Sequence, residues 1–390
     1  MPVIVGVPRE TERGETRVAL VPPTVAKLTG LGAEVVVESG AGLASFIEDA
    51  DYGGARVLPA ARDVYAAAGL VLKVQPPTAA ETEQLRPGSV LVGMIPAYKF
   101  PGRVAALRDR GVTAFAMELL PRITRAQSMD VLSSQAAIGG QKAALMAACA
   151  LGRLLPMFTS AVGTIRPAKV VVLGAGVAGL QAIATAHRFG AVVEAYDVRA
   201  ATREQVQSVG GRFIDMPISA EGEGGYAREL TEEEHRLEAQ TLAEHIVAAD
   251  AVITTAAVPG KPAPVLIPAA VVERMKRGSV IVDLAAEGGG NCELTRPGAT
   301  VERHGVIIVG PLNVPALLPA QASDMYAKNL ANFVALLVKD GVYEPDWDDE
   351  VVAGTALVRD GVIVHEPSRA LVEEWEAGGG DEETPLEAAS

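Results

Sequence analysis

Apolar residues gather along this chain into short runs that are separated by longer polar or amphipathic stretches. The runs are four or five residues long and rich in β-branched residues, which is typical of strands buried in a parallel sheet. Stretches with helical spacing, such as residues 24–31 and 103–110, lie between them, so the pattern predicts alternating strands and helices. The expected strands are residues 3–7, 34–37, 70–74, 90–92, 113–116, 169–173, 192–196, 251–255, 280–284 and 306–309.

These runs fall into two series, and each series predicts one α/β domain. The first domain is expected to contain residues 1–135 and a returning segment of about residues 320–376, and the second to contain residues 136–319. In the returning segment, Ser323 and Asp324 are expected to cap a helix whose apolar spacing ends before Gly341. The acidic, glycine-rich tail at 377–390 is expected to be disordered.

The most informative motif follows the strand expected at residues 169–173. Gly174, Gly176 and Gly179 form the pattern GxGxxG, in which the first glycine permits a tight turn and the second lets a pyrophosphate approach the backbone. The third lets the next helix pack against the strand, and the helix N-terminus with Val177 favours an anion. The alternative interpretation is a glycine-rich turn without a ligand.

An acidic residue strengthens the dinucleotide interpretation. Asp197 ends the next expected strand, at about the twenty-residue distance where a carboxylate binds the adenosine ribose hydroxyls. A carboxylate there repels a 2′-phosphate, so NAD(H) is preferred over NADP(H). Arg199, two residues further on, could offset this repulsion because its charge is positive.

Composition excludes several classes of protein. The formal net charge is −14 and the pI is about 5.0, so no basic stripe exists for nucleic acid. No run is long enough to cross a bilayer, and the N-terminus lacks the order of a signal peptide, so a cytoplasmic location is expected. Cys149 and Cys292 have neither metal-type nor disulfide-type spacing; both are interpreted as buried thiols, and no metal site is expected.

Two further segments are candidates for ligand contacts. Residues 118–135 place many hydrogen-bonding side chains between apolar stretches, as the wall of a cleft between domains requires; Ser128 or Asp130 could also cap a helix there. Residues 217–234 form an unusually long connection, which is typical of a lid, with Tyr226 able to cover a ligand. A plain acidic surface loop is the alternative.

The polar residues of the first domain do not provide an obvious general base. Its candidates are Arg17 and Lys73, which by residue type alone are expected to be solvated or salt-bridged, and the first 186 residues of the chain contain no histidine. A dehydrogenase acting on an amino or hydroxy acid needs such a base. Direct hydride transfer between two nicotinamides requires only that the rings be positioned, and a cluster of Arg, Gln, Asp and Ser suits that task.

Five motifs stand out at residues 122–136, 224–229, 254–266, 282–295 and 310–333. They closely resemble the soluble NAD(H)-binding first domain of proton-translocating nicotinamide nucleotide transhydrogenases. The resemblance extends to about residue 365 and implies an α/β fold of two Rossmann-like, doubly wound parallel-sheet domains with a cleft between them. It also implies NAD(H) as cofactor, NADP(H) on a partner subunit, a membrane-spanning partner that translocates protons, a homodimer, and peripheral attachment to the cytoplasmic membrane.

The resemblance also implies site residues. At the nicotinamide end these are Arg122, Gln127, Asp130 and Ser133, with Arg125 nearby, and of these Arg122, Gln127, Asp130 and Ser133 are the catalytic candidates. The remaining cofactor contacts are Gly174, Gly176, Val177, Gly179, Asp197, Val198, Arg199, Gly225, Tyr226, Glu238 and Ala257. Glu238 stands near a position where the family tends to have glutamine, and Ala257 where a larger aliphatic residue is common.

Two rival functions remain open. The opening segment and the residues around Lys73 also resemble alanine dehydrogenase, in which Arg17 and Lys73 would hold the amino acid. The histidine expected after the next strand is missing there, and Met94 lies in that neighbourhood. The second rival is a catalytically silent NAD-binding protein, against which the intact polar cluster argues.

Overall fold

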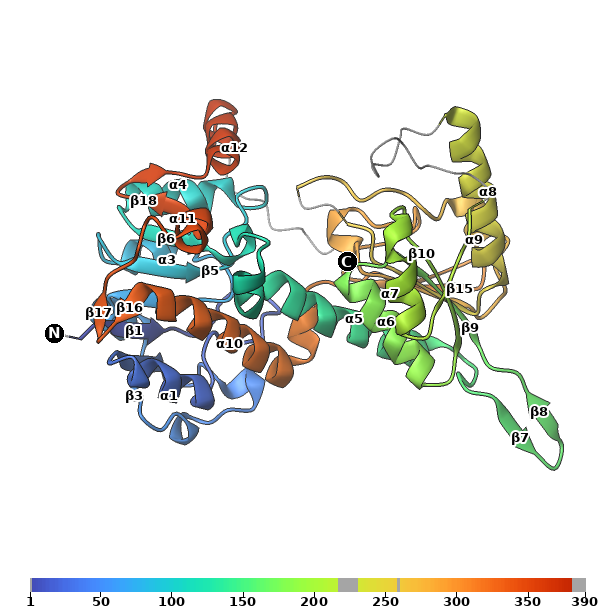
Figure 1. The fold of residues 1–390 in the computed structure, drawn as a ribbon, viewed down its shortest axis with the longest axis horizontal. Helices are drawn as coiled ribbons and strands as arrows, with labels where there is room; N and C mark the ends of the chain where they lie inside the picture. Colours follow the sequence, from blue (N-terminus) through green and yellow to red (C-terminus); the bar gives the residue numbers. More distant parts are fainter. Residues whose placement is uncertain (1, 217–230, 258–259, 381–390) are drawn as a thin grey trace. The chain divides into compact units, whose positions relative to one another are not determined.

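The protein divides into two compact units. The computed structural model describes residues 2–216, 231–257 and 260–380. Unit 1 contains residues up to Gln135 and those from Pro315 onward, and unit 2 contains Ala136–Val314. Figure 1 shows the helices and strands of both units in sequence colours.

Unit 1 is built on an eight-stranded sheet of order β19-β18-β6-β5-β4-β1-β2-β3. The first six strands of the chain pair in parallel, whereas β18 and β19 from the returning segment pair antiparallel at one edge. The strands are β1 Ile4–Val7, β2 Glu34–Glu38, β3 Arg56–Leu58, β4 Leu70–Leu72, β5 Val90–Gly93, β6 Thr113–Ala116, β18 Ala356–Arg359 and β19 Val362–Ile363. A separate hairpin joins β16 Val338–Lys339 to β17 Val342–Tyr343.

Helices cover both faces of this sheet, because each face of a parallel sheet carries apolar residues that must be buried. On one face α1 and α10 share an apolar cluster with β1, β2, β4 and β5, and on the other α2, α4 and α12 share one with β4, β5, β6 and β18. The unit 1 helices are α1 Pro22–Gly30, α2 Ala61–Ala67, α3 Ala79–Gln84, α4 Pro101–Asp109, α10 Pro319–Leu337, α11 Glu350–Thr355 and α12 Glu366–Ala377. Short 3₁₀ turns include η3 Met117–Leu119 and η4 Thr124–Met129.

Unit 2 contains a seven-stranded sheet of order β11-β10-β9-β12-β13-β15-β14, in which only β14 runs antiparallel among the described strands. The chain crosses from β11 back past β10 and β9 to β12, so the strand order reverses beside β9. Ligands of open α/β sheets bind at such a reversal, outside the carboxyl ends of the strands. The strands are β9 Lys169–Leu173, β10 Val192–Tyr196, β11 Arg212–Phe213, β12 Ala251–Thr254, β13 Val280–Asp283, β14 Thr300–Arg303 and β15 Val306–Val309.

Helices also cover both faces of the unit 2 sheet. One apolar cluster joins the sheet to α5, α6 and α7, and a second joins it to α8 and α9. A hairpin of β7 Phe158–Ser160 and β8 Gly163–Ile165 precedes β9, and all its residues are exposed. The helices are α5 Val131–Ala150, which begins in unit 1, α6 Val177–Arg188, α7 Arg203–Ser208, α8 Glu232–Ala248 and α9 Ala269–Val272.

Both units are α/β with mostly parallel sheets and helices on both faces, which confirms the predicted fold class. One helix start was predicted wrongly. Helix α10 begins at Pro319, so Ser323 lies inside the helix, where its hydroxyl accepts a hydrogen bond from the Val18 backbone at 3.0 Å. Pro319 explains the earlier start. Proline has no N–H group, and the N–H groups in the first turn of a helix have no acceptor within the helix, so proline is favoured there.

A second correction concerns the cysteines. Cys292 is buried as predicted, but Cys149 is exposed near the end of α5. Composition and spacing carry no information on which face of a helix a lone cysteine occupies. No helix among the described residues is both long enough and apolar enough to cross a membrane.

Candidate functional site

A glycine turn joins β9 to α6 at the carboxyl edge of the unit 2 sheet. Gly174 has a φ of +98°, a conformation that side chains disfavour, so it permits the turn. A Cβ atom on Gly179 would lie 1.9 Å from the Gly174 carbonyl oxygen, so α6 can start this close only at a glycine. A Cβ atom on Gly176 would meet no described heavy atom within 4 Å. Gly174 and Gly179 therefore build the turn, and Gly176 faces a space that no described residue fills.

Helix α6 begins directly after Gly176, which is its N-cap residue. The Leu180 N–H donates to the Gly176 carbonyl at 2.8 Å, so the N–H groups of Val177 and its two successors precede the first bonded turn. Such N–H groups and the helix dipole favour an anion. The Val177 side chain is 44 % exposed and can contact a ligand. The geometry therefore meets the backbone requirements of a diphosphate.

Asp197 lies beside this turn, directly after β10. Its Oδ2 accepts a hydrogen bond from the Ala175 N–H at 2.7 Å, and its Oδ1 accepts one from the Arg199 N–H at 2.9 Å. The Arg199 guanidinium also donates to both oxygens, each at 2.9 Å. Burial raises the pKa of Asp197, but the hydrogen bonds from Arg199 outweigh it, so the pKa is lowered. The carboxylate is therefore ionised and paired, while Val198 between the two residues is 71 % exposed.

Glu238 approaches the same strand from α8. The Tyr196 hydroxyl donates a hydrogen bond to its carboxylate. Burial, and then this hydrogen bond, raise the pKa of Tyr196. Glu238 is therefore tied to the residue immediately before Asp197. The two other candidates in the long connection, Gly225 and Tyr226, lie outside the described residues.

Sequence reasoning missed the residue that supports the loop after β12. Ala257 is exposed in that loop, and its neighbour Ala256 is held by the buried side chain of Asn291. The Asn291 Oδ1 accepts from the Ala256 N–H at 3.1 Å, and its Nδ2 donates to the carbonyls of Ala256 and Pro264 at 2.7 and 2.8 Å. The signal in the sequence is a single amide directly after three glycines.

In unit 1 the predicted polar cluster forms η4 and the start of α5. Asp130 accepts two hydrogen bonds from Ser133, at 2.9 Å from its N–H and 2.6 Å from its hydroxyl, which confirms Asp130 as the predicted helix cap. Arg122 and Gln127 are exposed. Arg125 donates through both terminal nitrogens to the Asp349 carboxylate at the start of α11, and the hydrogen bond from its Nη1 measures 2.7 Å.

Arg17 and Lys73 were each predicted to be either solvated or salt-bridged. The structure shows both side chains salt-bridged and buried. Arg17 is 3 % exposed and donates to both oxygens of Glu15. Lys73 is 1 % exposed, with its Nζ 2.9 Å from Glu81 and 3.2 Å from Glu10. Both cations are thus neutralised by carboxylates of their own unit.

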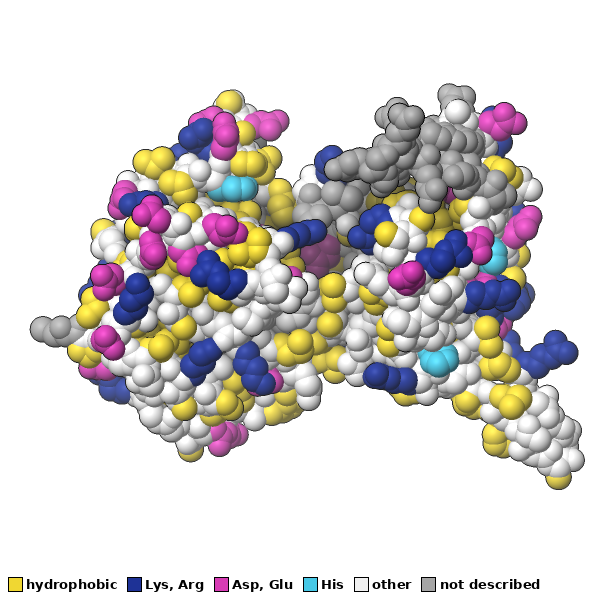
Figure 2. All heavy atoms as spheres, in the orientation of Figure 1, with side chains coloured by type: hydrophobic (Ala, Val, Ile, Leu, Met, Phe, Trp, Pro, Cys, Tyr) yellow, Lys and Arg dark blue, Asp and Glu magenta, His cyan; other side chains and the backbone are white. Residues whose placement is uncertain are grey.

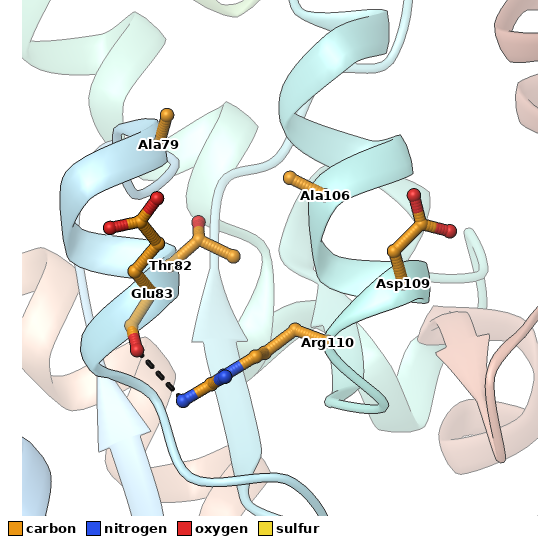
Figure 3. A pocket seen from close by; sticks show the side chains of 6 residues that line it. All are labelled: Ala79, Thr82, Glu83, Ala106, Asp109 and Arg110. Atoms are coloured by element: carbon orange, nitrogen blue, oxygen red, sulfur yellow. Dashed lines mark hydrogen bonds between the residues drawn. The ribbon is translucent and has the colours of Figure 1, made fainter.

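Other features of the structure add no site. A shallow depression between α3 and α4, of about 320 Å³, is lined mainly by small and surface residues (Figure 3). There Arg110 donates to the Glu83 carbonyl at 2.8 Å. Within the part of the chain that the structure describes, no three acidic, histidine or cysteine side chains lie together as metal ligands would. Met94, in the neighbourhood where the histidine was expected, packs against the apolar core of unit 1.

Fold and site together define a class. Two α/β units, one of which carries an open glycine turn and a paired acid at its strand reversal, are typical of two-domain dehydrogenase-like proteins. Family models agree: residues 6–139 match the N-terminal domain of alanine dehydrogenase/PNT, and residues 143–366 match its C-terminal domain. The chain belongs to this family of NAD(H)-binding, dehydrogenase-like proteins.

The similar proteins include both transhydrogenases and alanine dehydrogenases. The chain is 50 % identical to the first part of NAD(P) transhydrogenase subunit alpha from Rhodospirillum rubrum, covering 93 % of this chain and 97 % of that protein. The crystal structure of transhydrogenase from Sinorhizobium meliloti superposes with a TM-score of 0.85 at 47 % identity, covering 93 % of this chain and all of that one. Alanine dehydrogenase of Mycobacterium tuberculosis is 33 % identical over 93 % of each chain.

Proposed function

We propose that this chain is the NAD(H)-binding subunit of a proton-translocating transhydrogenase. It passes hydride between NADH and NADP⁺ held on a partner subunit, and a membrane-spanning partner couples this transfer to proton movement. Family membership and the likeness to transhydrogenase alpha subunits support the proposal. The observation that carries the NAD(H) part is the open space at Gly176, beside the start of α6 and the ionised Asp197.

The residues present fit the cofactor in their chemistry. The N–H groups at the start of α6 would bind the diphosphate, Asp197 the adenosine ribose, and Val177 and Ala257 apolar parts of the nucleotide. Bound NADH supplies the hydride. In unit 1, Arg122 and Gln127 are exposed and can hold a carboxamide, whereas Asp130 and Ser133 are bonded to each other and fix the start of α5.

Positioning is the whole task of these residues in the proposed mechanism. Direct transfer between two nicotinamide rings moves no proton at the reacting carbon, so the site needs no general base. Its side chains bind and orient the rings and exclude water. Arg17 and Lys73 are buried and paired with carboxylates, and the first 186 residues contain no histidine. Both observations support this function over amino-acid oxidation.

We further propose that the subunit is a homodimer located on the cytoplasmic side of the membrane and attached through its partners. The β7–β8 hairpin supports association with a second copy, because it presents large apolar side chains to solvent (Figure 2). Met157 is 65 % exposed, Phe158 50 % and Val162 99 %. A Phe158→Ser, Val162→Ser double variant should sediment as a monomer; an unchanged dimer would place the interface elsewhere.

The proposed activity is tested by mixing the purified chain with an NADP(H)-binding transhydrogenase subunit and following NADH and an NADP⁺ analogue by absorbance. Hydride transfer should require both proteins. Gln127→Asn should slow transfer and leave NADH affinity within a few fold, since most binding contacts lie in unit 2. The chain alone, given NAD⁺ and alanine, should form no NADH. Alanine-dependent NADH formation would establish the dehydrogenase alternative, and NADH binding without either reaction would indicate a silent NAD-binding protein.

A further inference from the structure

Two amides of α10 converge on one backbone carbonyl in the η4 turn. The Asn329 Nδ2 donates to the Ser128 carbonyl oxygen at 2.9 Å, and the Asn332 Nδ2 donates to the same oxygen at 2.8 Å. Ser128 follows Gln127 directly and precedes Asp130 by two residues. The two donors therefore act on the centre of the polar turn.

Asn329 also holds the other side of Asp130. Its Oδ1 accepts a hydrogen bond from the Ser134 hydroxyl at 2.7 Å, so one side chain connects the turn before Asp130 to the helix after it. Asn329 is only 8 % exposed. A buried amide with its hydrogen bonds satisfied fixes geometry strongly, because breaking any of these bonds leaves a polar group without compensation.

Asn332 is anchored from behind. Its Oδ1 accepts a hydrogen bond from the Lys27 ammonium of α1, which leaves its Nδ2 directed at Ser128. Both asparagines project from a helix whose Leu330, Phe333 and Val334 are fully buried in the core of unit 1. The pair thus transmits the position of a rigid, packed helix to the exposed turn.

We propose that Asn329 and Asn332 are positioning residues that set the place of Gln127 and Asp130 for hydride transfer. This inference rests on the proposed function, and it assigns a role to residues outside the motif that carries the polar cluster. A shift of ~1 Å in a group that orients reacting rings costs on the order of a hundredfold in rate. Nucleotide affinity should respond little, since the diphosphate and ribose contacts belong to unit 2.

Replacement by aspartate provides an isosteric test. In Asn329→Asp and Asn332→Asp the bonds from Ser134 and Lys27 can persist, but the donor to Ser128 is lost and an acceptor faces its carbonyl. With the partner subunit present, we expect Asn329→Asp to slow hydride transfer by about ten- to a hundredfold. Asn332→Asp should slow it less, and the NADH dissociation constant should stay within about threefold of wild type.

Two controls separate positioning from general destabilisation. Lys328→Gln changes an exposed residue of the same helix that pairs with Asp324, and should transfer hydride at the wild-type rate. Asn332→Gln keeps an amide donor on a partly exposed site and should recover most of the rate lost in Asn332→Asp. Hydrogen exchange at the amides of residues 127–130 should quicken in both aspartate variants and stay unchanged across unit 2.

The outcomes separate this inference from the proposed function. If wild-type protein with its partner transfers no hydride, the proposed function fails, and hydrogen exchange still reports whether the asparagines hold the turn. If wild type is active and both aspartate variants transfer hydride normally, the positioning role is wrong. Equal losses of rate and of NADH affinity, or a slow Lys328→Gln control, would also overturn it.

Discussion

The first strand of the large sheet is followed by a different kind of segment in each unit. After β9 the chain turns through glycines, and no side chain of the described residues lies within 4 Å of a Cβ placed on Gly176. After β1 the chain carries Glu10, whose carboxylate accepts hydrogen bonds from the N–H groups of Val74 and Gln75 at 2.6 and 3.3 Å. In unit 1 a carboxyl group of the chain thus accepts the backbone hydrogen bonds that a ligand would accept in unit 2.

This difference determines which of the two sheet edges has backbone donors available to an external anion. Backbone donors at a sheet edge bind an anion only if nothing internal satisfies them first. Glu10 satisfies them, and Lys73 and Glu81 complete a buried network around it. This edge of the unit 1 sheet therefore has a fixed, buried interior, and the residues proposed to hold the carboxamide, Arg122 and Gln127, lie on the surface of that unit instead.

The largest expected effect comes from breaking the buried network. Lys73→Met leaves Glu10 and Glu81 without their cation, and we expect the free energy of unfolding to fall by about 3–5 kcal/mol. Chemical denaturation measures it. Lys169→Met is the matched control, because Lys169 pairs with Glu194 at 2.8 Å while 26 % of its side chain is exposed, so its loss should cost about 1 kcal/mol or less.

A second test in unit 1 uses pH. Burial raises the pKa of Glu118 from its ordinary 4.5 to about 7, although hydrogen bonds from its own N–H and that of Ile95 oppose the rise. Between about pH 4.5 and 7 the folded protein binds more protons than the unfolded chain, so this residue makes stability fall as pH rises. The total is up to about 3 kcal/mol.

Glu118→Gln should remove that fall, so its advantage over wild type should grow from pH 4.5 to pH 7 and then level off. Glu15 changes the free energy of unfolding with pH in the opposite direction. Burial raises its pKa but hydrogen bonds from Arg17 lower it to about 2, so its contribution is lost as the pH falls from 4.5 towards 2. A Glu118→Gln variant with the wild-type pH profile would show that Glu118 is ionised in the folded protein.

The glycine turn offers the third test. Gly176→Ala adds a Cβ that no heavy atom of the described residues approaches within 4 Å, so the thermal unfolding midpoint should hardly change. NADH affinity should fall by about tenfold to a hundredfold if the diphosphate occupies that space, as a loss of ~1.4–2.8 kcal/mol. Gly179→Ala is the contrasting variant, because its Cβ would collide with Gly174 and lower both stability and binding.

Much of the fold could be predicted from sequence, and the reason is local. Strands of apolar β-branched residues and a glycine turn of fixed spacing depend on neighbouring residues, so β9, α6 and Asp197 are found where the pattern places them. Short or atypical elements were missed, such as β3, with its exposed Arg56, and the exposed β7–β8 hairpin.

The candidate site was less accessible to sequence reasoning because its supports are distant in the chain. Arg125 pairs with Asp349, 224 residues away, and Asn329 reaches Ser128 across 201 residues. A single sequence does not reveal such pairs, since any exposed arginine could meet any acid. Burial is equally hidden: nothing around Lys73 in the sequence separates a solvated lysine from one enclosed by two carboxylates.

The smallest expected effect concerns nucleotide choice, and it depends on how the Asp197–Arg199 pair divides its charge. Asp197 repels a 2′-phosphate, but Arg199 already donates to both of its oxygens, so the net field at the ribose is weaker than a lone carboxylate would give. Because part of the repulsion remains, wild type should still prefer NADH to NADPH. Two substitutions should move that preference in opposite directions. Asp197→Asn should reduce the ratio of NADH to NADPH affinity by several fold, which corresponds to about 1 kcal/mol. Arg199→Gln should increase that ratio.

Calorimetric titration of both variants with both nucleotides measures the two changes, and salt provides the control. Because the 2′-phosphate interaction is electrostatic and partly exposed, raising the ionic strength should shrink the difference between NADH and NADPH in every variant. If Arg199→Gln instead weakens discrimination, the charge of Arg199 does not offset the repulsion and serves only to orient Asp197. In that case the preference for NADH would depend on hydrogen bonds to the ribose hydroxyls. The geometry of the Asp197 carboxylate, and not the net charge beside it, would then decide which nucleotide unit 2 binds.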